Sequence, residues 1–88
     1  MSVSATEIEA TLRSVLRPEA LEVIDDSHLH VGHAGAREGR HFTVVVTSGR
    51  FEGLTRVARH RLVYDALHDL MPRGIHALAI DARTPQPS

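Results

Sequence analysis

The sequence of 88 residues contains no cysteine and no tryptophan, and aromatic residues make up only 3% of it. Without cysteine, the chain can form no disulfide and offers neither a thiolate nucleophile nor a thiolate metal ligand. It also lacks a signal peptide and any apolar run long enough to cross a bilayer. We therefore expect an intracellular, cytoplasmic protein with no membrane association.

An excess of charge of either sign is missing as well. The formal net charge is −1, which argues against a protein that binds nucleic acid over its whole surface. The apolar content of 42% is ordinary for a folded protein, and the length suits one domain with a small core. We expect residues 1–88 to form that single domain, with residues 84–88 as a loose tail because two prolines lie there.

Histidine, by contrast, is abundant, with seven residues in a short chain. Three of them, His28, His30 and His33, lie close together in a stretch that also contains glycine. A fourth, His76, lies at the start of a short apolar run near the C-terminus. A single histidine at the start of a strand is more often a hydrogen-bonding group of the fold than a metal ligand, so spacing alone does not assign it.

Two segments have apolar residues at helical spacing. Residues 5–16 form the first, and Ser4 and Glu7 have the spacing of a capping box at its start. Residues 56–71 form the second, which we expect to end at Pro72 because proline has no amide hydrogen to donate.

Three other segments have the composition of strands, at residues 20–27, 41–48 and 75–82. Residues 27–40 contain glycine and no apolar period, so they are predicted to be a loop. The resulting order, αββαβ, predicts an α+β fold. A loop joins the first two strands, which favours antiparallel pairing, whereas a helix joins the second and third, which favours parallel pairing. The prediction is a three-stranded mixed sheet with the helices on one face.

This topology has a consequence for the histidines. The loop at residues 27–40 enters the second strand at the end of the sheet where a parallel third strand also begins. We therefore expect His76 to lie near the loop that carries His28, His30 and His33, and near His41. The N-terminus of the long helix should lie at the opposite end. Asp25 and Asp26 are adjacent carboxylates, but no nucleophile, phosphate loop or protease motif accompanies them, so we predict that the protein is not an enzyme.

The sequence resembles the BolA family over about residues 12–85. Four motifs carry the resemblance: LEVIDDSH at residues 21–28, HF at 41–42, RHRLVY at 59–64 and GIHALAI at 74–80. Each motif alone would be weak, but the four together are highly specific.

The resemblance implies a fold similar to class II KH domains and a partnership with a monothiol glutaredoxin. In that partnership a [2Fe-2S] cluster is shared with the glutaredoxin and glutathione, and no cofactor is expected in the isolated protein. The resemblance makes His76 a cluster ligand and assigns a second ligand to the loop. His30 matches that ligand best by position, and His33 remains an alternative. His28 and His41 are expected to be packing or supporting groups.

The resemblance also implies an alternative function, because DNA binding and transcriptional regulation are described for some members of the family. The residues that would contact DNA are the basic cluster at the start of the long helix: Arg56, Arg59, His60 and Arg61. Arginines on the first turns of a surface helix are commonly just solvated. DNA is thus the alternative partner that the resemblance implies, and a solvated helix surface is the competing interpretation of these arginines.

Overall fold

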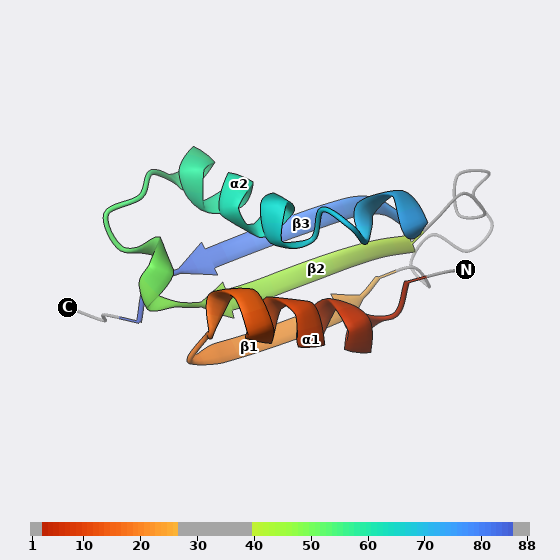
Figure 1. Ribbon diagram of the computed structural model, residues 1–88, viewed down its shortest axis with the longest axis horizontal. Helices are drawn as coiled ribbons and strands as arrows, with labels where there is room; N and C mark the ends of the chain where they lie inside the picture. Colours follow the sequence, from red (N-terminus) through yellow and green to blue (C-terminus); the bar gives the residue numbers. More distant parts are fainter. Residues whose placement is uncertain (1–2, 27–39, 86–88) are drawn as a thin grey trace.

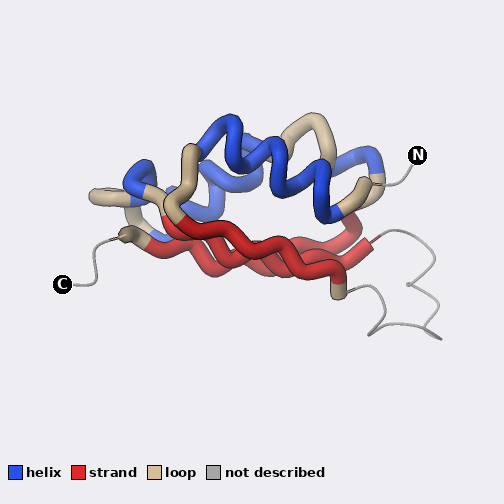
Figure 2. Tube along the Cα trace, turned by 90° about the horizontal axis from the view of Figure 1, so that it is seen from below, coloured by secondary structure: helices blue, strands red, loops and turns tan. Residues whose placement is uncertain are grey.

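The computed structural model describes residues 3–26 and 40–85. Its elements in chain order are α1 (Ala5–Leu16), β1 (Ala20–Asp25), β2 (Arg40–Thr47), the 3₁₀ turn η3 (Gly49–Phe51), α2 (Arg56–Ala66), the 3₁₀ turn η4 (Met71–Arg73) and β3 (Ile75–Arg83). The sheet has the order β1-β2-β3, with β1 antiparallel and β3 parallel to β2. Both helices cover one face of the sheet, and no described element covers the other, the bare face (Figures 1 and 2). The predicted α+β fold with a mixed sheet is confirmed.

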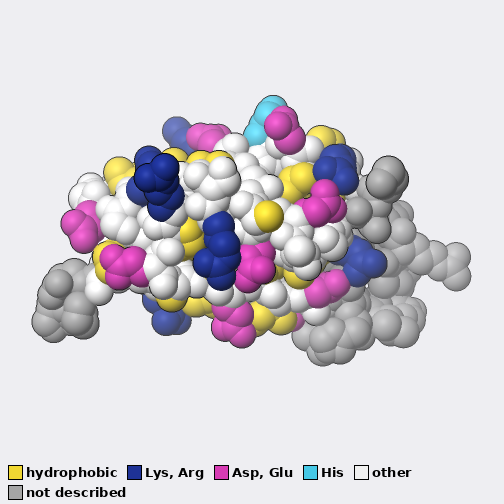
Figure 3. Space-filling model, turned by 60° about the horizontal axis from the view of Figure 1, so that its bottom comes forward, with side chains coloured by type: hydrophobic (Ala, Val, Ile, Leu, Met, Phe, Trp, Pro, Cys, Tyr) yellow, Lys and Arg dark blue, Asp and Glu magenta, His cyan; other side chains and the backbone are white. Residues whose placement is uncertain are grey.

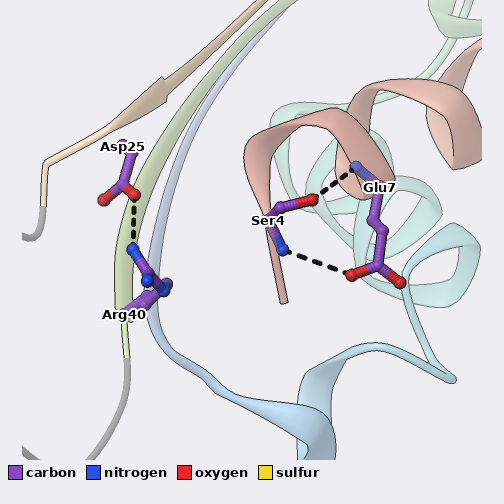
Figure 4. Close-up of polar contacts among 4 residues, drawn as sticks. All are labelled: Ser4, Glu7, Asp25 and Arg40. Atoms are coloured by element: carbon purple, nitrogen blue, oxygen red, sulfur yellow. Dashed lines mark hydrogen bonds and ion pairs between the residues drawn. The ribbon is translucent and has the colours of Figure 1, made fainter. Parts of the chain in front are cut away.

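Helix α1 begins and ends where the sequence predicts. The Ser4 hydroxyl accepts a hydrogen bond from the Glu7 amide at 3.2 Å, and the Glu7 carboxylate accepts one from the Ser4 amide at 3.3 Å (Figure 4). This capping box satisfies two amides that have no partner within the helix. Arg17 ends the helix in the left-handed region, at φ 47°, and Pro18 follows it. No helix within the described residues is long and apolar enough to cross a membrane.

The hydrophobic core lies between the helices and the covered face of the sheet. Alternate residues of β2 are fully buried, at Phe42, Val44 and Val46, because side chains of a strand point to opposite faces in turn. The helices contribute residues at helical spacing to the same core. They are Ile8, Leu12 and Leu16 of α1, and Val63 of α2 with Leu67 just after it. The bare face is therefore built from the other half of each strand.

Helix α2 is shorter than the sequence indicates, because it ends at Ala66 rather than at residue 71. The Leu67 amide already contacts the carbonyls of both Val63 and Tyr64 at 3.1 Å, and the Leu70 amide bonds the Leu67 carbonyl at 2.8 Å. These tighter turns still place Leu67 and Leu70 in the core. Residues three apart share a face in both kinds of helix, so apolar spacing could not reveal where α2 stops.

Helix α2 also binds the edge strand β3 through polar side chains. The Arg59 guanidinium donates to the carbonyl of Leu54 at 3.1 Å and to that of Ala82 at 3.3 Å. The Tyr64 hydroxyl lies 3.4 Å from the carbonyl of Leu78. The carbonyls of Leu78 and Ala82 belong to a strand that has a neighbour on one side only. Arg59 thus joins the start of α2 to the end of β3.

We predict that Arg59→Ala destabilises the protein by about 1–3 kcal/mol, because two carbonyls lose a charged donor. The measurement is unfolding in urea followed by circular dichroism. Arg61→Ala is the matched control, since Arg61 is exposed on the same helix and forms no hydrogen bond or ion pair with the other described residues. The free energy of unfolding of that control should stay within about 0.5 kcal/mol of the wild-type value. Equal midpoints for the two variants would contradict the joining role of Arg59.

Candidate functional site

His76 lies at an irregularity in the sheet. Arg40 of β2 pairs with Ile75, but the next residue, His41, pairs with Ala77, so β3 has one extra residue at this point. Ile75 is buried, whereas His76 and Ala77 are both exposed. A bulge of this kind reorients one side chain without disturbing the rest of the strand. Here it turns the imidazole of His76 to the bare face of the sheet.

The imidazole of His76 packs against that of His41. The two ring centroids are 5.1 Å apart and the ring planes are inclined by 45°. His41 alternates with buried Phe42 along β2, which puts its ring on the bare face as well. The sequence-based expectation treated His41 as a packing or supporting group, and its position fits such a role. The expected proximity of His41 to His76 is confirmed, and the extra residue in β3 is what brings the two rings into contact.

Polar contacts hold β1 and β2 together at the same end of the sheet. Arg40 and Asp25 form an ion pair with a nitrogen–oxygen distance of 2.8 Å (Figure 4). The Thr43 hydroxyl donates to the Asp26 carboxylate, and the Asp26 amide bonds the His41 carbonyl at 2.7 Å. The carboxylates of Asp25 and Asp26 therefore both have partners within the sheet, which agrees with a structural role for these two residues.

The predicted convergence is confirmed for His76 and His41, which lie together at one end of the sheet. Strand β1 ends at Asp25 and β2 begins at Arg40 at this same end of the sheet, beside the start of β3. The loop ligands expected at His30 and His33 fall outside the described residues, as does His28. Within residues 3–26 and 40–85, no three or more His, Cys, Asp or Glu side chains are grouped so as to hold a metal ion.

The predicted basic cluster divides between two surfaces. Arg56, Arg59 and His60 line a hollow of about 660 Å³ between the start of α2 and the end of β3. Arg61 instead lines a shallow apolar depression along α2, together with exposed Val57. The hydrogen bond from Arg59 to Ala82 puts this region at the opposite end of β3 from His76, as predicted. On the face drawn in Figure 3, acidic and basic side chains are interspersed and form no field of one sign.

Comparison with known proteins shows a consistent set of relatives. Residues 12–87 match the family model described as BolA-like protein. The chain is 43% identical to BolA-like protein 1 of Mus musculus over 88 residues, which covers 96% of this chain and 63% of the mouse protein. It therefore spans less than two thirds of that relative.

Two further relatives bear on the fold and the alternative function. The chain is 47% identical over 79 residues to the DNA-binding transcriptional regulator BolA of Vibrio cholerae, covering 90% of this chain and 73% of that protein. Its structure is similar to the BolA domain of SufE1 from Arabidopsis thaliana, with a TM-score of 0.82 and 42% identity. That match covers 97% of this chain and 95% of the other.

The packing of the two imidazoles gives a direct test of the extra residue in β3. We expect nuclear Overhauser effects between the ring protons of His41 and His76 in the isolated protein, because the centroids are 5.1 Å apart. The cross-peaks should disappear in His76→Ala and persist in His68→Ala. Rings without mutual cross-peaks would mean that β3 pairs with β2 in an uninterrupted register, which would turn His76 and Ala77 to opposite faces.

Proposed function

Since the chain belongs to the BolA-like protein family, we propose that it is an accessory protein of iron–sulfur metabolism. It binds a monothiol glutaredoxin and contributes histidine ligands to a [2Fe-2S] cluster that the glutaredoxin carries. The observation that supports this proposal most is the exposed imidazole of His76, held on the bare face by the extra residue in β3. The role is one of binding and ligation rather than catalysis.

The residues fit such a cluster in their chemistry. Imidazole nitrogen is a suitable ligand for iron, and the side chain of His76 is exposed where a partner can reach it. The chain has no thiolate, so in this proposal the remaining ligands come from the glutaredoxin, from glutathione and from a loop histidine, His30 or His33. The cluster supplies one-electron chemistry, and histidine ligation in place of cysteine raises its reduction potential.

The neighbours of His76 keep it in position for this role. His41 packs against one side of the imidazole and so limits its rotation. The ion pair between Asp25 and Arg40 fixes the strand ends beside the histidine pair. Less side-chain freedom is then lost when His76 binds a metal, because its ring is already confined.

We predict that His76→Ala abolishes the change in visible absorption and circular dichroism that the wild type produces with cluster-loaded monothiol glutaredoxin. The fold should survive, because the side chain of His76 is exposed and lies outside the core. His68→Ala is the matched control, since His68 is an exposed histidine that follows α2 in the layer of helices. It should leave the spectral change intact.

The loop histidines extend the same experiment. His30→Ala should give a partial loss if His33 can replace it, and the double variant should match His76→Ala. A wild-type spectrum from His76→Ala at neutral pH would refute the ligand assignment. A full effect of His68→Ala would show that the assay responds to something other than ligation on the bare face.

A second candidate function is DNA binding, and Arg56 and His60 in the hollow between α2 and β3 favour it, although the Asp81 carboxylate also lines that hollow. The hollow adjoins the N-terminus of α2, where amides and basic side chains attract phosphate. The relative from Vibrio cholerae is named a DNA-binding transcriptional regulator, which supports the same candidate. Arg59 is already engaged with two backbone carbonyls, so we assign the phosphate contact to Arg56.

If DNA is bound there, Arg56→Ala should weaken binding to all sequences alike. The slope of log K against log salt should fall by about one, the value for one lost phosphate contact. Fluorescence anisotropy over a series of salt concentrations measures this slope. Arg73→Ala is the control, because Arg73 pairs with Glu7 at 3.1 Å at the other end of the helical layer. The same slope in wild type and Arg56→Ala would remove the hollow as a DNA site.

A further inference from the structure

The two outer strands of the sheet differ in what lies along their free edges. On β3, the carbonyls of Leu78 and Ala82 lie within hydrogen-bonding distance of Tyr64 and Arg59, which belong to α2. Strand β1 is the other outer strand, and among the described residues β2 is its only strand neighbour. The backbone groups along an unpaired strand edge are a template for a further strand. The free edge of β1 is therefore a place where another chain can add to the described sheet.

The pairing with β2 determines which backbone groups of β1 face this edge. The Asp26 amide donates to the carbonyl of His41 at 2.7 Å, which continues the register of the antiparallel pair. Residues in such a pair alternate between facing the neighbouring strand and facing away from it, so the residues two and four positions before Asp26 also face β2. The amides and carbonyls of Leu21 and Val23 point the opposite way. Two donors and two acceptors are thus presented along the edge with the spacing of a strand.

The side chains beside this edge select the chemistry of an added strand. Glu22 is exposed on the bare face and forms no ion pair with another described residue. Residues 18–24 hold a second exposed carboxylate, Glu19, and no basic residue. On the covered side, Leu21 and Val23 are partly buried and pack against the core. An added strand therefore meets a carboxylate on one face and apolar surface on the other, because its side chains alternate as those of β1 do.

A second copy of this chain fits the edge less well. Antiparallel pairing of two β1 strands about Glu22 puts its carboxylate directly opposite the same carboxylate of the other copy. Pairing about Val23 puts the two carboxylates on a diagonal, which long side chains still span. Like charges across a strand pair are destabilising, whereas opposite charges are favourable. The charge beside the edge thus favours a basic strand over a copy of β1.

We propose that the free edge of β1 binds an extended, basic segment of another protein as a fourth strand. The backbone of the segment pairs with that of Leu21 and Val23, and its basic side chains lie beside Glu22. In this binding mode the backbone hydrogen bonds provide affinity and alternate side chains provide specificity. These edge residues pair with residues 44–46 of β2 rather than with His41, so the site is separate from the imidazole pair.

The test uses two synthetic peptides of the same length as β1, one of alternating arginine and valine and one of alternating glutamate and valine. Each is added in excess to the full chain, and amide hydrogen exchange is followed at each residue by NMR. We expect the basic peptide to slow exchange at Leu21 and Val23 about tenfold when its free concentration exceeds its dissociation constant about tenfold. The acidic peptide should leave the exchange rates of both amides unchanged.

Variants of β1 separate the roles of charge and backbone. Glu22→Arg should remove the protection by the basic peptide and let the acidic peptide protect the same amides. Glu52→Arg makes the same change at an exposed position directly after η3 and should behave like the wild type. Val23→Pro removes an amide that faces away from β2, a position where a strand tolerates proline, and should abolish binding of the basic peptide. Thermal unfolding checks that each variant folds, and Glu22→Arg remains decisive if Val23→Pro does not fold.

Four results would overturn the proposal. Equal protection by the two peptides would show that charge does not select the strand, and no protection by the basic peptide would show that the edge does not bind it. The protein without peptide gives the other two. Slow exchange at Leu21 and Val23 that increases with protein concentration would assign the edge to a second copy of this chain. Slow exchange at every concentration would assign it to another part of the same chain.

Discussion

The register between the parallel strands β2 and β3 determines which residues of this protein face the core and which face outward. The extra residue at His76 lets buried Ile75 and inward-facing Leu78 both contact the core, although they are three residues apart. In an uninterrupted strand, positions that differ by three lie on opposite faces. The irregularity therefore keeps the core intact and also brings the imidazole of His76 beside that of His41.

Because the described helices cover one face of the sheet only, the residues that stabilise the fold differ from those that the sheet exposes to a partner. The described core lies between the helices and the covered face, so an outward residue such as Ala79 lies outside it. Strand β3 also has different functional groups near its two ends. His76 lies at its beginning, and the carbonyl of Ala82 near its end binds Arg59. The histidine pair and Arg56 therefore lie at opposite ends of β3.

Much of the fold was predictable because local patterns agreed with the tertiary structure. Ser4 and Glu7 define the start of α1, and the apolar alternation of β2 identifies its buried face. The end of α2 was predicted wrongly, since Leu67 and Leu70 keep their spacing through tighter turns. The structural role of Arg59 could not be predicted from the sequence, because its guanidinium donates to the carbonyls of Leu54 and of Ala82, which is 23 positions away.

By itself, the sequence determined the α+β class, the order of the strands and the end of the sheet where His76 lies. These properties follow from hydrophobic period, turn residues and connection length, which are local. The sequence also placed His76 near His41, but only the tertiary structure decided that their rings pack through the extra residue in β3 and that Arg59 supports the fold. Both depend on how β3 aligns with elements distant in sequence, and a shift of one residue there reverses the face of a side chain.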